Sequence, residues 1–183
     1  MPMTSQAVFG GGCFWCTESI FKELKGVISV MPGYAGGERP SPTYEQVCGG
    51  DTGHAEVIRV EFDPAALAYA DLLKVFFATH DPTTLNRQGN DVGTQYRSII
   101  LYADDAQKSD AETVIAELKA TGAYGGREVV TEVKPLETFW EAEGYHRDYY
   151  AKNRGVNPYC QLVIDPKLAK FREKFRSLLK TQE

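Results

Sequence analysis

The sequence predicts one α+β domain, on three observations. The chain has 183 residues, of which 43% are hydrophobic and 25% charged, as expected for a domain with an ordinary core. No internal repeat, low-complexity segment or long linker divides residues 1–183. Stretches with strand periodicity and stretches with helix periodicity are mixed without strict alternation. This mixture favours α+β over a doubly wound parallel sheet.

The first half of the chain predicts three strands and two helices. A strand at 7–9 runs into a glycine-rich turn, and the helix after it ends at Gly26. A strand at 28–30 is broken by Pro32 and Gly33. HAEVIRVEFDP, at 54–64, is the clearest strand because its apolar residues alternate with polar ones. A helix at about 66–79 has these apolar residues: Leu72, Leu73, Val75, Phe76 and Phe77.

The second half predicts three strands and three helices. A strand is expected at 95–102, and Asp104 or Asp105 caps a helix that ends at Gly122. REVVTEV, at 127–133, has the composition of a strand, and FWEAEGYHRDYYAKN, at 139–153, that of an aromatic helix. YCQLVI, at 159–164, is expected to be a strand. A C-terminal helical extension is expected over about 166–180, with these residues facing inward: Leu168, Phe171, Phe175 and Leu178.

Charge and composition exclude several function classes. The net charge of −5 is spread without a basic stripe, which argues against nucleic acid as a partner. No apolar run approaches the roughly 20 residues that cross a bilayer, and the N-terminus has no signal-peptide pattern. A cytoplasmic protein is therefore expected. Four cysteines in such a chain indicate catalysis, redox chemistry or a metal rather than a disulfide framework.

GGCFWC, at 11–16, places a thiol where a glycine-rich turn passes into a helix. The unpaired amides and the dipole of a helix N-terminus favour an anion, so the pKa of Cys13 is expected to be lowered towards neutrality. Cys16 follows one turn later and could react with an oxidised Cys13. A zinc site is not expected, because the other candidate ligands, Cys48, His54 and Cys160, are scattered. Cys48 is expected to serve packing.

Glu56 has the same parity as the apolar residues of its strand, so it is expected to face the core. Burial raises the pKa of a carboxyl and lets it donate a proton near neutral pH. The alternative is a glutamate that faces solvent at the strand's edge. Tyr44, Asp91 and Tyr96 lie in or beside loops and are candidates for a polar wall, but spacing alone does not select them from ten tyrosines. The histidines are expected to be structural: His54, His80 and His146.

Four stretches, in this order, resemble the peptide methionine sulfoxide reductases of the A type: GGCFWCTE, TGHAEVIRVEFDP, HDPTTLNRQGNDVGTQYRS and FWEAEGYHRDYY. The match runs from about Val8 to Cys160. The resemblance implies a two-layer α/β plait of ferredoxin-like type, with a mixed sheet, helices packed on it and irregular extensions. It also implies reduction of the S epimer of methionine sulfoxide, free or in proteins, without a metal or a bound cofactor.

Carried onto matching positions, the resemblance makes Cys13 the nucleophile and Glu56 the acid beside the sulfoxide oxygen. It assigns substrate binding to five residues: Phe14, Trp15, Tyr44, Asp91 and Tyr96. Cys13 would become a sulfenic acid, condense with another thiol to a disulfide, and be reduced by thioredoxin or a small dithiol. Oxidised proteins would be the other partners, and the enzyme is expected to be a monomer.

Two cysteines are candidates for the resolving thiol. Many family members have glycine where this chain has Cys16, and use a cysteine in a mobile C-terminal tail. Cys160 lies near that family position, which favours it, although its surroundings look ordered. Cys16 needs little travel. Two other readings are a general dithiol–disulfide oxidoreductase that uses Cys13 and Cys16, and a binding module whose cysteines only pack or bind a metal.

Overall fold

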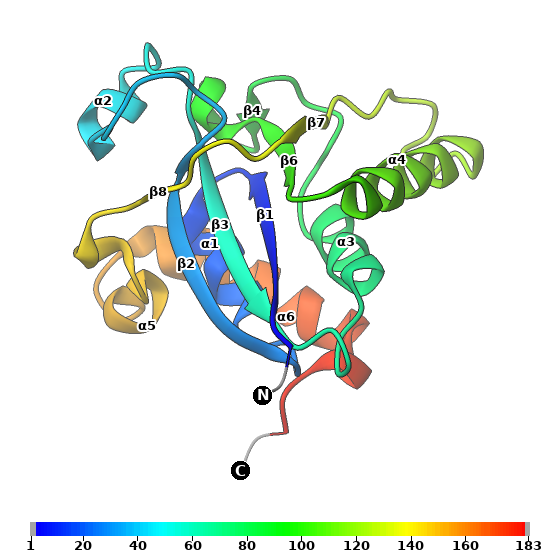
Figure 1. The fold of residues 1–183 in the computed structure, drawn as a ribbon. Helices are drawn as coiled ribbons and strands as arrows, with labels where there is room; N and C mark the ends of the chain where they lie inside the picture. The colour runs from blue at the N-terminus through cyan, green and yellow to red at the C-terminus, as the bar shows by residue number, and fades with distance from the viewer. Residues whose placement is uncertain (1–2, 182–183) are drawn as a thin grey trace.

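A computed structural model describes residues 3–181. Its centre is a six-stranded sheet in the order β7-β6-β1-β3-β2-β8 (Figure 1). The inner strands run antiparallel to one another, whereas β7 lies parallel to β6 at one edge. The strands are β1 (Ser5–Gly11), β2 (Val27–Ala35), β3 (Ala55–Phe62), β6 (Ser98–Tyr102), β7 (Glu132–Pro135) and β8 (Trp140–Glu141). A mixed sheet with helices packed on it is therefore confirmed.

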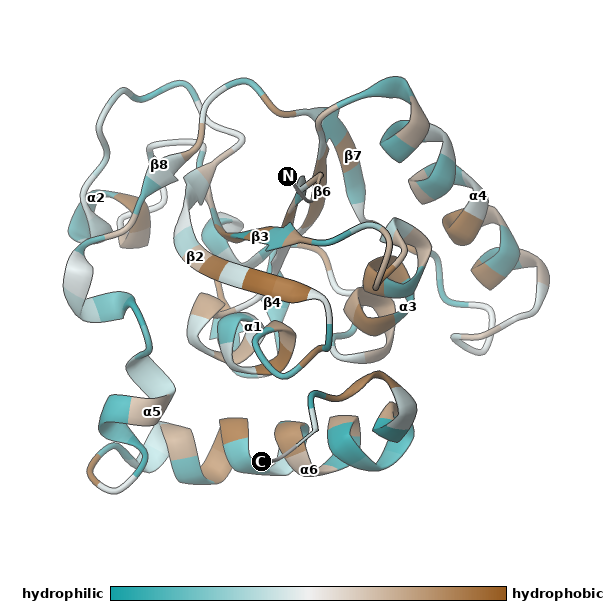
Figure 2. Ribbon diagram, turned by 60° about the horizontal axis from the view of Figure 1, so that its bottom comes forward, coloured by the Kyte–Doolittle hydropathy of each residue, from teal (hydrophilic) through white to brown (hydrophobic). Residues whose placement is uncertain are grey.

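Helices cover one face of the central strands. α1 (Phe14–Phe21) packs on β2 and β3, and α6 (Asp165–Lys174) lies against α1 on the side away from the sheet (Figure 2). The other helices are α2 (Tyr44–Cys48), α3 (Tyr69–Ala78), α4 (Asp105–Ala120) and α5 (Tyr149–Asn153). Short elements complete the set: β4 (Arg87–Gln88), β5 (Asp91–Val92), η1 (Thr94–Tyr96), η2 (Gly144–His146), η3 (Cys160–Ile164) and η4 (Arg176–Leu178).

None of the helices between residues 3 and 181 has the length and apolar character needed to cross a membrane.

Alternation along β1 and β3 sends two sets of side chains to opposite faces of the sheet. Phe9 is fully buried on the helix-covered face, where its ring lies 5.6 Å from that of Phe21 and 5.1 Å from that of Phe76. Ile58, Val60 and Phe62 belong to the same cluster, as their spacing predicted. The opposite face buries a smaller cluster: Val8, Ala35, Ala55, Val57, Ile99 and Leu101, packed against Leu136 and Phe139.

β2 does not break at Pro32 and Gly33, contrary to the prediction. The strand continues to Ala35, with Pro32 opposite Ile58 in the ladder. Gly33 is required by close pairing, since a Cβ there would lie 2.4 Å from the carbonyl oxygen of Trp140 on β8. Glycine therefore serves the approach of a neighbouring strand.

The aromatic segment 139–153 is not one helix. Its start pairs with β2 as β8, and only Tyr149–Asn153 is α-helical. Asp148 has φ +57, a left-handed conformation that an uninterrupted helix does not contain. Two other predicted strands are shorter: 127–133 joins the sheet only from Glu132, and 95–97 belongs largely to η1.

The prediction of a strand at 159–164 is also wrong, because these residues are helical and run directly into α6. Cys160, Ile164, Leu168 and Phe171 are each at most 2% exposed. They lie three or four positions apart, so the buried stripe follows the period of a helix. α6 and η4 together cover most of the range expected for a C-terminal helical extension.

Candidate active site

Cys13 is the N-cap of α1, at the end of a glycine turn that leaves β1. A Cβ on Gly10 would lie 2.9 Å from the carbonyl oxygen of Glu56, so glycine lets β1 and β3 approach closely here. Gly12 has φ +100, a conformation that favours glycine. These constraints place a thiol at the start of the helix, as the sequence predicted.

The first amide of α1 is bonded by a carboxyl from the neighbouring strand. The Phe14 N–H donates to Glu56 Oε2 over 3.0 Å, whereas the Cys13 side chain caps nothing. Glu56 is 2% exposed, so its predicted orientation towards the core is confirmed. Burial raises the pKa of Glu56 to about 8, against the lowering effect of the Phe14 hydrogen bond. This carboxyl is therefore mostly protonated at neutral pH, with one oxygen committed to Phe14.

The thiols of Cys13 and Cys16 shift each other's pKa in opposite directions. Burial and the hydrogen bond with Cys16 raise the pKa of the Cys13 thiol. The hydrogen bond from Cys13 is the main cause that lowers the pKa of Cys16 to about 7, against its burial. The prediction of a lowered pKa for Cys13 is therefore wrong for this arrangement. The Phe14 amide is already bonded to Glu56, and the charge of that carboxyl opposes a second negative charge on Cys13.

An aromatic wall stands beside these thiols. Trp15 Nε1 donates to His146 Nδ1 over 3.0 Å, and the indole stacks on Tyr149 with centroids 3.7 Å apart. Trp15 is partly exposed, so it can contact a ligand. Phe14 is 1% exposed, with its ring 5.0 Å from that of His146. In this arrangement Phe14 supports the wall from within.

Two tyrosine hydroxyls lie close enough to Glu56 for its charge to act on them. Burial, and then the charge of Glu56, raise the pKa of Tyr44 and of Tyr96, which keeps both hydroxyls protonated. The Tyr44 ring also packs on His146, with centroids 4.5 Å apart. The charges of Cys13 and Asp91 act on Tyr96 as well. The structure thus brings both predicted tyrosines into the surroundings of Glu56.

Asp91 reaches the thiols through a residue that the sequence did not single out. Tyr159 Oη donates to Asp91 Oδ2 over 2.8 Å and lies 3.7 Å from Cys16 Sγ. Tyr159 comes from the segment before α6, immediately ahead of Cys160. Cys160 is fully buried, and burial raises the pKa of its thiol.

Cys48 does not serve packing as predicted. It lies exposed at the end of the short helix α2. Over residues 3–181, no group of three or more His, Cys, Asp or Glu side chains is arranged to hold a metal ion.

His146, Tyr149 and Tyr159 are the site residues that sequence reasoning missed. His146 is indeed buried, as expected of a structural histidine, but it also fixes the indole of Trp15. The dense aromatic run EGYHRDYY was the available signal, because such a run in an irregular segment needs an apolar surface to pack on.

Comparison with known proteins supports one family. A family model described as peptide methionine sulfoxide reductase matches residues 5–179. A peptide methionine sulfoxide reductase MsrA from Saccharolobus solfataricus is 56% identical over 177 residues, which cover 97% of this chain and 98% of that protein. MsrA from Sulfolobus acidocaldarius is 58% identical over 169 residues, covering 92% and 94%.

Solved structures are similar over most of the chain. Methionine sulfoxide reductase A of Corynebacterium diphtheriae has a TM-score of 0.81 at 36% identity, covering 87% of this chain and 80% of its own. Mxr1 from Saccharomyces cerevisiae in reduced form has a TM-score of 0.76 at 34% identity, covering 84% and 88%.

Proposed function

Because this chain belongs to the peptide methionine sulfoxide reductase family, we propose that it reduces the S epimer of methionine sulfoxide, free or in proteins, to methionine. One observation carries the proposal: a thiol at the start of α1 shares its surroundings with a buried, largely protonated carboxyl. A sulfoxide needs both groups at once, a nucleophile for its sulfur and a proton for its oxygen.

In the first step the proton of Cys13 passes to Cys16, and the Cys13 thiolate attacks the sulfoxide sulfur. Glu56 gives its proton to the sulfoxide oxygen. The oxygen moves to Cys13, methionine leaves, and Cys13 becomes a sulfenic acid. Methionine sulfur is reduced by two electrons, and Cys13 is oxidised by two. The Phe14 amide holds Glu56 in place throughout.

In the proposed binding mode, the side chains around Cys13 separate the two small groups on the sulfoxide sulfur by polarity. Trp15, fixed by His146 and stacked on Tyr149, forms the apolar side for the methyl group. Phe14 supports that side from within the core. Tyr44 and Tyr96, with Asp91 behind them, form the polar side for the oxygen. One chirality of sulfur then presents both groups correctly.

Cys13 sulfenic acid is resolved by a second thiol. Cys160 has the family position, but it is fully buried in helical backbone, and burial raises the pKa of its thiol. Cys16 follows Cys13 by one helical turn, and its pKa of about 7 leaves a large thiolate fraction at neutral pH. These two facts favour Cys16 as the first partner, with Cys160 as a possible next one in a relay.

The resulting disulfide is reduced by an external dithiol, thioredoxin or a small molecule. The structure of Mxr1 of Saccharomyces cerevisiae has been solved in complex with Trx2. Thiolate attack by such a partner on one sulfur returns both cysteines to the reduced state.

We also infer that the core is a ferredoxin-like plait. The support is the order β6-β1-β3-β2, with α1 connecting β1 to β2 and α3 connecting β3 to β6. The remaining expectations stay part of the proposal: a single domain, a monomer in the cytoplasm, and no metal, bound cofactor or nucleic acid.

The test supplies a small dithiol and the separate S and R epimers of a blocked methionine sulfoxide. Consumption of the S epimer alone is expected, and consumption of both or of neither contradicts the proposal. Cys13→Ser should abolish the reaction, because an alcohol is too weak an acid to pass its proton to Cys16 and cannot form a sulfenic acid. Cys48→Ser, at the exposed end of α2, is the matched control and should retain it.

A second candidate is a general dithiol–disulfide oxidoreductase, which the lowered pKa of Cys16 beside Cys13 favours. Such an enzyme would reduce the disulfides of insulin at a rate unaffected by Glu56→Gln. Loss of sulfoxide reduction in that variant supports the first candidate instead.

A further inference from the structure

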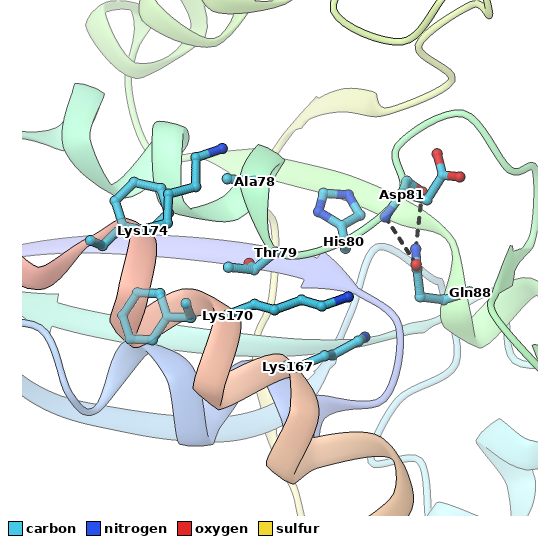
Figure 3. A pocket seen from close by; sticks show the side chains of 10 residues that line it. Ala78, Thr79, His80, Asp81, Gln88, Lys167, Lys170 and Lys174 are labelled. Atoms are coloured by element: carbon cyan, nitrogen blue, oxygen red, sulfur yellow. Dashed lines mark hydrogen bonds between the residues drawn. The ribbon is translucent and has the colours of Figure 1, made fainter.

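A groove lined by lysines lies between the end of α3 and α6 (Figure 3). Its volume is about 450 Å³. Lys167 and Lys170 of α6 extend towards His80 and Gln88, and Lys174 lies beside Ala78. The residues that line it do not include the nucleophile or the carboxyl of the active site. The proposed reaction leaves these three cations without a role.

A smaller cavity connects this groove to a thiol. Its lining includes Cys16 and Gly11 together with Lys167 and His80. Thr79, His80 and Lys167 also line the groove, so the two spaces share a boundary. Of the three lysines, only Lys167 borders the cavity that Cys16 lines.

The groups that act on Cys16 come from several elements. From the first half of the chain they are Cys13 before α1, Glu56 on β3 and His80 after α3. Asp91 lies on β5. The C-terminal segment contributes Tyr159, Cys160 and Lys167. Burial lowers the pKa of His80 to about 4, so it is neutral at pH 7, with hydrogen bonds to the Phe76 carbonyl and to Ser98 Oγ. Asp91 opposes a negative charge on Cys16. Lys167 is the one member of this set that is positive at neutral pH.

We propose that Lys167 is a positioning residue for the resolving step, in which its ammonium stabilises the thiolate of Cys16 across the small cavity. The proposal rests on the proposed function for the identity of that step. The Cys16 thiolate attacks the sulfur of the Cys13 sulfenic acid, an S–S bond forms, and the S–O bond breaks. Hydroxide leaves and takes up the proton that Cys16 had released, so water departs. Cys16 is oxidised and the sulfenic sulfur is reduced.

The charge on Lys167 fits this role because the cavity has little room for water. A cation beside a poorly hydrated thiolate lowers the free energy of the charged form more than the same cation would in bulk solvent. The pKa of Cys16 is lowered in part by Lys167, as this geometry requires.

The test compares Lys167→Met with Lys170→Met, which removes a charge from the same helix and groove without touching the cavity. Both are made in a background with Cys13, Cys48 and Cys160 changed to serine, so Cys16 is the single thiol. Thiolate absorbance is then followed against pH. Lys167→Met should raise the pKa of Cys16 by about one unit, a tenfold loss of thiolate well below that pKa. Lys170→Met and Lys167→Arg should leave it unchanged.

An unchanged pKa in Lys167→Met, or an equal rise in Lys170→Met, overturns the proposal. If Lys167→Met fails to fold by circular dichroism, Lys167→Gln takes its place under the same criteria. Single turnover in the enzyme with all four cysteines gives a second readout. Lys167→Met should slow disulfide formation about tenfold and accumulate Cys13 sulfenic acid, trapped by dimedone, whereas Lys170→Met should not. Absence of a methionine burst in the unmodified enzyme would instead refute the proposed function.

Discussion

Replacing Glu56 by glutamine should change two measurable properties: the pH dependence of folding stability and the rate of methionine release. In the folded protein the pKa of Glu56 is about 8, whereas its ordinary value is 4.5. Between these two values the folded state keeps a proton that the unfolded state has released. Folding stability therefore falls as the pH rises through this window, and it is insensitive to this group outside it.

The magnitude follows from the gap between the two pKa values. It corresponds to about 5 kcal/mol over the whole window, and to about 4 kcal/mol between pH 5 and pH 9. Glutamine cannot ionise, and its side-chain oxygen can still accept from the Phe14 amide. Relative to the parent, Glu56→Gln should thus become more stable as the pH rises, by an amount of this order.

The assay is urea unfolding of the reduced protein at a series of pH values between 5 and 9. Glu61→Gln is the matched control, because it changes a partly exposed glutamate on the same strand. Single-turnover methionine release should fall about 100-fold in Glu56→Gln, since the proton donor is lost. Parallel pH profiles for the parent and Glu56→Gln would show that Glu56 is ionised in the folded state, and the reasoning would fail.

Three further predictions concern the resolving thiol, the aromatic wall and the glycine turn. Peptide mapping after one turnover should find a Cys13–Cys16 disulfide, and Cys16→Ser should accumulate dimedone-reactive Cys13. A Cys13–Cys160 disulfide in the parent would contradict Cys16 as the first resolving thiol. His146→Phe removes the acceptor of Trp15 Nε1 and should lower the free energy of unfolding by about 2 kcal/mol and raise KM, measured by urea titration and steady-state kinetics. Gly10→Ala brings a Cβ to 2.8 Å from Ile99 Cγ2 and should cost about 1–3 kcal/mol, visible as a lower Tm by calorimetry; an unchanged Tm excludes that clash.

Local sequence patterns predicted the structure correctly where neighbouring residues determine it. Alternation in AEVIRVEF predicted which face of β3 carries Glu56, because a buried strand sorts its side chains by parity. The glycines before Cys13 predicted the handover from strand to helix, because only glycine fits the turn. Both features depend on a few adjacent positions.

Features that depend on residues far apart in the sequence could not be predicted from local patterns. The pKa of Cys13 depends in part on Glu56 and that of Cys16 in part on Lys167, and both partners lie far along the chain. Residues 159–164 are mostly apolar, which suggested a strand, yet their helical stripe becomes visible only with Leu168 and Phe171 included. Trp15 gained its orientation from His146, which no local rule connects to it.

The arrangement of α1 also determines when the site can exist during folding. Trp15 and His146 are separated by 131 positions, and Cys16 and Tyr159 by 143. Glu23, near the end of α1, pairs with Arg172 of α6, 149 positions later. Contacts of such sequence separation form slowly, and a ribosome releases their second partners last. The helix that follows the nucleophile is therefore synthesised early, but its contacts with His146 and Tyr159 form late. The site can become active only when the C-terminal segment has docked.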